Sequence, residues 1–353
     1  MAHIVPAPFD PDDGIMGGAE RYSYELARHM AERVPTRLIT FGTRARTTQV
    51  GPLEVQVLRG TWVHGQRTNP FSSALWGALA DATVVHCHQQ HVVASSAAAV
   101  FTRLRRRRVF VTDLGGGGFD ISGYLSTDRL FHGHLHISEY SRTIAGHARH
   151  PRARVILGGV DADKFSPAPA TDEGVLFVGR LLPHKGVHDL IEAVAPDVPL
   201  RIVGQPLDAD YANTLRARAS GKCVTFVHDA DDDQLVAEYR RATCVVLPSV
   251  YTMPDGRTTR VPELLGQTLL EGMACGRPTI CTDVASLPEV VLHGETGYVV
   301  PAANPQALAT AIATLHANPG EAERLGANGR SRVLDRFRWD NVVDRCISAY
   351  LEM

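Results

Sequence analysis

The chain has 353 residues, of which 44% are hydrophobic and 21% are charged, as in an ordinary globular protein. Because this length exceeds what one hydrophobic core usually organises, two domains of about 150 to 200 residues are expected. The formal net charge of −2 excludes a global positive field that would recruit nucleic acid, so an anionic ligand would need a local site.

The N-terminal stretch MAHIVPAPFDPDDG has no basic segment followed by an apolar one, which predicts a cytoplasmic protein without a secretory signal. The longest apolar stretches fall well short of the roughly 20 residues that a membrane span requires. The six cysteines are scattered without a CxxC pair, and we expect them to be buried free thiols.

In the first 160 residues, short apolar runs alternate with helical patterns, which predicts a parallel sheet with helices on both faces. The expected strands are 2–7 (AHIVPA), 36–42 (TRLITFG), 83–88 (TVVHCH), 108–114 (RVFVTDL), 134–138 (HLHIS) and 153–159 (ARVILGG). After the first strand, Gly17 and Gly18 open a helix where a phosphate or sugar could approach the backbone. The full GxGxxG spacing is absent, so an ordinary tight turn is the alternative.

Polar residues follow two of these strands. The histidines of TVVHCHQQH, His86, His88 and His91, lack a supporting carboxylate or cysteine set, so a polar loop is favoured over a metal site. Asp113 stands at the end of another strand, before four glycines, and is a candidate substrate contact; a mobile loop is the alternative. The basic segment 102–108 (TRLRRRR) fits a solvated helix end, with peripheral membrane contact as the less favoured alternative.

A stretch at 161–174 is rich in proline, alanine and acidic residues and predicts a linker. The alternation then restarts, which predicts a second doubly wound domain over 175–338. Its expected strands are 175–179 (VLFVG), 200–204 (LRIVG), 223–228 (CVTFVH), 244–249 (CVVLPS), 278–282 (PTICT) and 297–301 (GYVVP). A final helix, 339–353, is predicted to return to the N-terminal domain.

Two cations, Arg180 and Lys185, follow the first strand of the second domain. A planar guanidinium and a compact ammonium suit a diphosphate, because ligands of open α/β sheets bind beyond the carboxyl ends of the strands. A solvated loop with two unrelated cations is the alternative.

The stretch VPELLGQTLLEGMACG, residues 261–276, begins a helix near Gly266 to Thr268. Free N–H groups and the positive end of the helix dipole predict an anion site there. Glu271 and Glu263 could accept hydrogen bonds from sugar hydroxyls. Alternatively, Thr268 and Glu271 form a capping box, which leaves Glu263 and Gly266 unexplained.

Taken together, these motifs resemble the family 4 retaining glycosyltransferases. The resemblance covers almost the whole chain and includes GGAERYSYELARHM, VGRLLPHKG, LVAEYRRATCVVLPS and PELLGQTLLEGMACGRPTICT. It implies the α/β GT-B fold, in which two doubly wound Rossmann-like domains face each other across a cleft.

The resemblance also implies roles. Arg180 and Lys185 would bind the donor diphosphate, Glu271 the ribose, and Glu263 the transferred sugar, in the family's E-x7-E pattern. The remaining donor contacts implied by the resemblance are Gly17, Gly18, Val227, His228, Gly266, Gln267, Thr268 and Leu269.

The activity that the resemblance implies is transfer of a hexose-type sugar, with retention, from a nucleoside-diphosphate sugar to a hydroxyl acceptor such as a glycan, glycolipid or small metabolite. A UDP-sugar is the preferred donor, and no metal or other cofactor is expected. In the usual proposal for the family, the departing phosphate deprotonates the acceptor on the front face, with countercharge from Arg180 and Lys185. The catalytic candidates are Glu263, Asp113, Arg180 and Lys185.

Two departures from the family pattern keep alternatives open. Leu114 stands where members of the family commonly carry a histidine, and loop 251–261 is longer than usual. A nucleotide-sugar-binding protein without turnover and another GT-B enzyme, such as an epimerase, are therefore the rival hypotheses. A phosphorylase is disfavoured, because no lysine lies in a convincing context for its cofactor.

Overall fold

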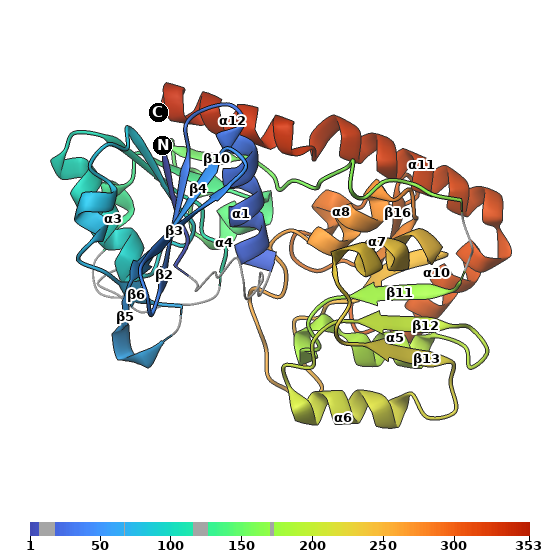
Figure 1. Cartoon of the computed structure of the whole chain (residues 1–353). Helices are drawn as coiled ribbons and strands as arrows, with labels where there is room; N and C mark the ends of the chain where they lie inside the picture. Colours follow the sequence, from blue (N-terminus) through green and yellow to red (C-terminus); the bar gives the residue numbers. More distant parts are fainter. Residues whose placement is uncertain (7–17, 67, 116–125, 170–172) are drawn as a thin grey trace. The chain divides into compact units, whose positions relative to one another are not determined.

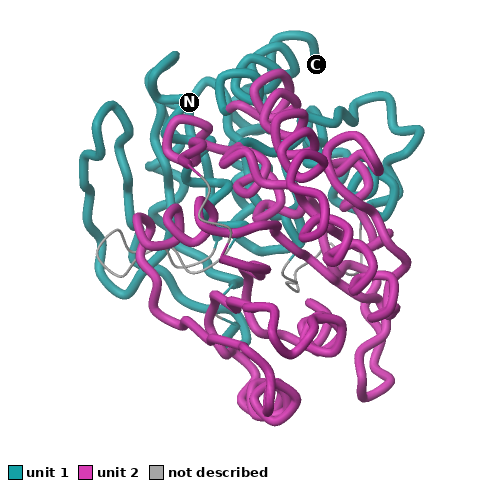
Figure 2. Tube along the Cα trace, turned by 90° about the vertical axis from the view of Figure 1, so that its right-hand side faces the viewer, with its two compact units in different colours: residues 1–159, 339–353 teal, residues 160–338 magenta. Residues whose placement is uncertain are grey.

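The computed structural model describes residues 1–6, 18–66, 68–115, 126–169 and 173–353. These residues form two compact units (Figure 2). Unit 1 comprises Met1–Gly159 with Trp339–Met353, and unit 2 comprises Val160–Arg338. Unit 2 therefore begins ahead of the stretch predicted to be a linker.

The core of unit 1 is a sheet (Figure 1). Among the described residues it has eight strands, in the order β10-β9-β8-β7-β1-β2-β4-β3. Neighbouring strands run parallel except β3 and β4. The strands are β1 Ala2–Ile4, β2 Arg37–Gly42, β3 Arg46–Val50, β4 Leu53–Arg59, β7 Val84–Cys87, β8 Arg108–Val111, β9 Gly133–His136 and β10 Ala153–Val155. A separate antiparallel pair is β5 Thr61–Trp62 and β6 Pro70–Phe71.

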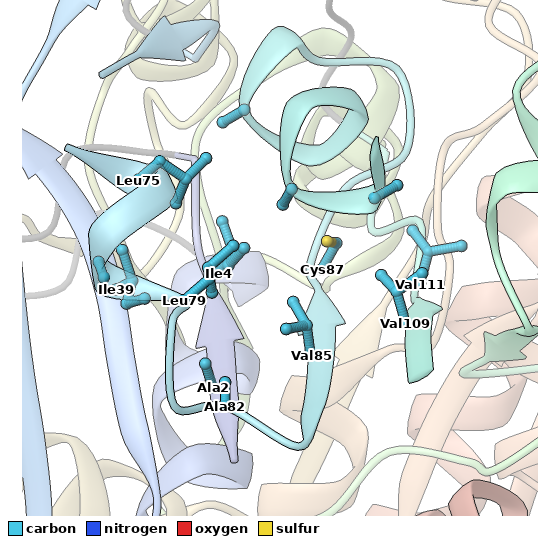
Figure 3. Close-up of a cluster of buried hydrophobic side chains, with 14 of the residues drawn as sticks. Ala2, Ile4, Ile39, Leu75, Leu79, Ala82, Val85, Cys87, Val109 and Val111 are labelled. Carbon is cyan, nitrogen blue, oxygen red and sulfur yellow. The ribbon is translucent and has the colours of Figure 1, made fainter. Parts of the chain in front are cut away.

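Helices cover both faces of this sheet. They are α1 Gly18–Ala31, α2 Leu75–Ala78, α3 Val93–Leu104, α4 Glu139–Ile144 and α12 Trp339–Glu352, with short 3₁₀ turns η1 Val63–Gly65 and η3 Asp128–Leu130. On the α3 face, alternate strand residues such as Ile4, Val85 and Val109 form a buried apolar cluster with the alanines of α3 (Figure 3). Because successive strand side chains point to opposite faces, the residues between them face the other layer.

That other layer contains α1 and α12, which pack against each other. It also buries three histidines completely or nearly so, His3, His86 and His88. His3 Nδ1 lies 2.8 Å from His88 Nε2, and the Tyr350 hydroxyl on α12 lies 2.8 Å from His86 Nδ1. His86 and His88 are therefore not part of a solvated polar loop, as the sequence had suggested; only His91 of that motif is exposed.

Unit 2 is a parallel sheet, six-stranded among the described residues, in the order β13-β12-β11-β14-β15-β16. The strands are β11 Val175–Val178, β12 Leu200–Val203, β13 Val224–Val227, β14 Cys244–Leu247, β15 Thr279–Thr282 and β16 Gly297–Val300. The helices are α5 Val187–Ala193, α6 Ala209–Arg218, α7 Asp232–Arg241, α8 Gln267–Ala274, α9 Leu287–Val290, α10 Pro305–Ala317 and α11 Pro319–Arg336, with the 3₁₀ turn η4 Pro183–Lys185. This is the doubly wound strand order of a Rossmann sheet.

The predicted α/β class with two parallel, doubly wound sheets is confirmed. All six cysteines are free; five are buried as predicted, whereas Cys223 is exposed. Within the described residues, no helix combines the length and the apolar character that crossing a bilayer needs.

The buried histidines predict that acid destabilises unit 1. Burial lowers the pKa of His86 to about 3 and holds the pKa values of His3 and His88 well below the usual 6.5. Since the unfolded chain binds these protons near pH 6.5, the free energy of unfolding should fall as the pH drops from about 6.5 toward about 3. Each histidine contributes up to about 1.4 kcal/mol per pH unit.

Urea unfolding at a series of pH values checks this. His88→Gln should flatten the pH dependence, because one of these protons is removed. His316→Gln, at an exposed position of α10, should leave it unchanged. The same slope in His88→Gln as in the wild type would contradict the explanation.

Candidate functional site

The candidate site lies at the point where the strand order of unit 2 reverses. β11 is flanked by β12 on one side and by β14 on the other. The chain leaves β11 and β14 in opposite directions, so the loops that follow them diverge and leave room for a ligand. Arg180 and Lys185 follow β11, and Glu263 follows β14, so the structure brings these three predicted residues to the same edge of the sheet.

The two loops are in direct contact. The N–H of Val250 donates to the carbonyl of His184 over 2.9 Å. Gly186, which ends η4, has φ +67°, and a Cβ built there would lie 1.9 Å from the carbonyl oxygen of Pro248. Only glycine therefore allows the loop after β11 to lie this close to the end of β14, which places Lys185 beside the second loop.

Glu263 is the anionic centre of the site and is 8% exposed. Its carboxylate forms an ion pair with Lys185 Nζ and accepts a hydrogen bond from Ser249 Oγ over 2.9 Å. Ser249 is itself held by Thr282, whose hydroxyl donates to the Ser249 carbonyl over 2.6 Å. Sequence reasoning missed Ser249 and Thr282, because a serine and a threonine at strand ends have no distinctive spacing.

Arg180 differs from Lys185 in being exposed. Among the described residues, no side-chain hydrogen bond or ion pair holds its guanidinium. Burial, with the nearby charges of Lys185 and Arg180, lowers the pKa of His184 to about 4, although Glu263 opposes the shift. His184 is therefore neutral at pH 7, and Arg180 is the cation of this loop that is available to an anionic ligand.

Helix α8 begins at Gln267, after Gly266 as its N-cap. Gly266 has φ +83°, and no side chain caps the helix. The capping box suggested for Thr268 and Glu271 is therefore wrong: Thr268 is the second residue of the helix and Glu271 the fifth, too far along to bond back to the cap. Gln267, Thr268 and Leu269 form the first turn of α8. Their predicted contact with an anion stays a prediction.

Glu271 points into unit 2. It is 3% exposed, and its Oε2 accepts a 2.6 Å hydrogen bond from the hydroxyl of Tyr239 on α7. The carboxylate thus has a structural partner that the sequence did not reveal. Its predicted contact with a ribose stays a prediction.

Val227 ends β13 and His228 follows it, two strands away from β11. Both are half-buried. His228 Nδ1 lies 2.8 Å from the carbonyl of Gly204, which follows β12, and the Gln205 side chain donates to the His228 carbonyl. These bonds fix the end of the strand where a nucleotide base was predicted to pack.

The long loop 251–261 folds back on itself. Thr252 and Thr258 form an antiparallel bridge, and the N–H of Met253 donates to the carbonyl of Arg257 over 2.8 Å. The Tyr251 hydroxyl accepts from the N–H of Ala285, beyond β15, over 2.8 Å. The extra length is therefore a hairpin anchored next to the site.

The other candidates belong to unit 1. Asp113 follows β8 and accepts a weak 3.5 Å hydrogen bond from the N–H of Gln90. Gly18 is the first residue of α1 and is exposed, and a Cβ added there would have nothing within 4 Å. Gly17 lies outside the described residues.

Substituting Gly186 tests the loop contact. Gly186→Ala should lower the free energy of unfolding by about 2 to 4 kcal/mol, because a strained left-handed φ and a collision with backbone add together. Gly221→Ala is the matched control: its φ is +77°, but nothing lies within 4 Å of the added Cβ, so only about 1 kcal/mol is expected. Urea unfolding measures both, and equal losses would show that the Pro248 contact is unimportant.

Both halves of the chain are similar to known proteins. Residues 161–332 match the model of the family described as Glycosyl transferases group 1. A GDP-mannose-dependent alpha-(1-6)-phosphatidylinositol monomannoside mannosyltransferase from Mycolicibacterium smegmatis is 32% identical over 227 residues. The match covers 58% of this chain and 58% of that protein, so the chain spans less than two thirds of the relative.

Solved structures resemble the chain over its whole length. Sucrose-phosphate synthase from Thermosynechococcus elongatus has a TM-score of 0.76 at 22% identity, covering 99% of this chain and 98% of that one. Anabaena Alr3699/HepE, solved with UDP and glucose, has a TM-score of 0.74 at 19% identity, covering 100% and 99%. Residues 161–332 thus match the glycosyl transferases group 1 family, and the fold of the chain is GT-B.

Proposed function

We propose that the protein is a retaining α-glycosyltransferase that moves a hexose-type sugar from a nucleoside-diphosphate sugar to a hydroxyl acceptor. The observation that carries the proposal is the meeting of Arg180, the Lys185–Glu263 pair and the start of α8 at the switch point of unit 2. This combination offers positive charge for a diphosphate and a carboxylate for a sugar within one site.

The cations supply the countercharge that a departing diphosphate needs. Arg180 can swing onto the phosphates without losing a partner among the described residues, and its planar fork suits two phosphate oxygens. Lys185 is already held by Glu263, so it is positioned before the donor arrives. The first turn of α8 adds the positive end of a helix dipole.

In the proposed step, the bond between the anomeric carbon and the diphosphate oxygen breaks while the acceptor oxygen approaches from the same face. The departing phosphate takes the acceptor proton, and positive charge builds at the anomeric carbon. Glu263 is proposed to face that sugar, and Asp113 is a further proposed polar contact to a substrate. Because Arg180, Lys185 and the start of α8 together supply positive charge to the leaving diphosphate, we propose that the step needs no metal.

The base of the donor is proposed to be uracil, packed at Val227 and His228. HepE binds UDP, which supports this choice, whereas the mycobacterial relative depends on GDP-mannose. The acceptor is proposed only as a class, a hydroxyl on a glycan, glycolipid or small metabolite. Because Leu114 stands where the family commonly carries a histidine, the alternative hypothesis is a nucleotide-sugar-binding protein without turnover.

A donor panel tests the proposal. Purified protein is incubated with UDP-, GDP- and ADP-sugars and candidate hydroxyl acceptors, and release of free nucleoside diphosphate is measured beside binding by calorimetry. We expect a UDP-sugar to bind and to turn over with an acceptor. Binding without any turnover would favour the rival, and failure of every donor to bind would refute the site.

Arg180 should be needed for binding but not for stability. Arg180→Ala is expected to weaken donor binding by about 10- to 100-fold, as loss of hydrogen bonds to a charged group does. Because the side chain is exposed, the free energy of unfolding should change by less than about 0.5 kcal/mol. Arg216→Ala, an exposed arginine of α6, is the control for charge alone, and equal donor affinities in the two variants would contradict the role of Arg180.

A further inference from the structure

Unit 1 contains a second cluster of histidines that the proposed function does not use. β9 reads GHLH, and all four residues are buried. A strand buried on both faces of a parallel sheet is normally apolar throughout, so two histidines in four residues are unusual. His134 and His136 point to one face of the strand, opposite to the face that carries Gly133 and Leu135.

A carboxylate and a further imidazole reach the same place. Asp128 belongs to η3, and His147 follows α4. One side-chain ligand atom from each of Asp128, His134 and His147 lies within 4.8 Å of the others. Three separate segments thus bring an oxygen and two nitrogens together.

His134 lacks the partners that buried imidazoles normally have. It is 1% exposed, and neither of its ring nitrogens has a well-formed hydrogen bond among the described residues. Buried side-chain nitrogens nearly always have a hydrogen-bond partner. An ion bound to a ring nitrogen of His134 would explain why this imidazole is buried without one.

The distance between His147 and Asp128 fits two ligand atoms of one metal ion better than it fits a hydrogen bond. His147 Nε2 lies 3.7 Å from Asp128 Oδ2, too far for a hydrogen bond. Bonds of about 2.1 Å in a tetrahedral zinc site place two ligand atoms about 3.4 Å apart. His147 Nδ1 lies 3.1 Å from His136 Nε2, so His147 can donate its other N–H to His136.

We propose that Asp128, His134 and His147 bind a divalent first-row transition-metal ion, with Zn²⁺ as the natural probe. Two imidazoles, one carboxylate and a fourth position for solvent make an N/O site of the kind such ions take. His136 fixes the ring of His147, while Ser126 Oγ, 3.1 Å from Asp128 Oδ2, and the Gln90 amide orient the carboxylate. The side chain of Asp128 is 37% exposed, which gives the ion a path from solvent.

By coordinating all three ligands, the ion would link η3, β9 and the segment after α4. Gln90 also joins this site to Asp113, because its amide bonds Asp128 and its N–H bonds the Asp113 carboxylate. The ion would therefore set the position of Asp113 from within unit 1. The proposed ion does not bind the donor diphosphate. The proposal of this metal site is therefore independent of the proposal that sugar transfer needs no metal.

The cluster of His3, His86 and His88 on the opposite layer is a poorer candidate. It contains no carboxylate, and both ring nitrogens of His86 are engaged, one with Tyr350 and the other with Thr112 over 2.8 Å. His3 and His88 bond each other. That cluster provides a control for binding by buried histidines in general.

The test uses the full-length protein after removal of metal with a chelator. Zn²⁺ is titrated by calorimetry at pH 7.5, and Co²⁺ is titrated by visible absorption, which reports imidazole and carboxylate ligands. We expect one ion per chain and a higher unfolding temperature with Zn²⁺. Absence of stoichiometric binding by the wild-type protein would overturn the proposal, whatever the variants do.

Substitutions assign the ligands. Asp128→Asn keeps the shape of a partly exposed side chain, and His147→Gln keeps a polar group; each should weaken Zn²⁺ binding by more than tenfold and alter the Co²⁺ spectrum. His88→Gln, in the other cluster, and His316→Gln, exposed on α10, should bind as the wild type does. Wild-type affinity in both ligand variants, or loss of binding only in His88→Gln, would overturn the assignment.

Discussion

The candidate site depends on one close contact, in which Gly186 lies against the carbonyl of Pro248 with no room for a Cβ. β11 and β14 are neighbours in the sheet, although two strands and three helices separate them along the chain. Their following loops can share a ligand only if they meet. The glycine lets them meet, and the Lys185–Glu263 ion pair then joins the two loops across the same contact.

That ion pair also explains why the two cations of the loop differ. Lys185 and Glu263 are largely buried, and each compensates the other, since an unpaired buried charge would be costly. Ser249 satisfies the carboxylate further. Arg180 remains exposed, so the site combines a fixed, partly neutralised pair with a cation that can adapt to a ligand. A fixed ion pair together with one adaptable cation suits a site that is preorganised before an anion binds.

The sheet of unit 1 buries histidines on both of its faces. On the α12 layer, His3 and His88 bond each other, and His86 bonds Tyr350 and Thr112. On the α3 layer, His134 has no such partner among the described residues. Buried histidines on the two faces of this sheet therefore differ in their hydrogen-bond partners. The helices and turns that cover each face cause this difference.

The sequence by itself determined the α/β class, the two parallel sheets and the places where charged residues follow strands, because hydrophobic periodicity and the alternation of strands with helices are local properties of the chain. It also singled out Arg180, Lys185 and Glu263. Only the tertiary structure decided that Glu271 bonds Tyr239, that Gly266 and not Thr268 caps α8, and that His86 and His88 are buried with His3. Those outcomes depend on contacts between segments far apart in sequence, which no spacing within one motif encodes.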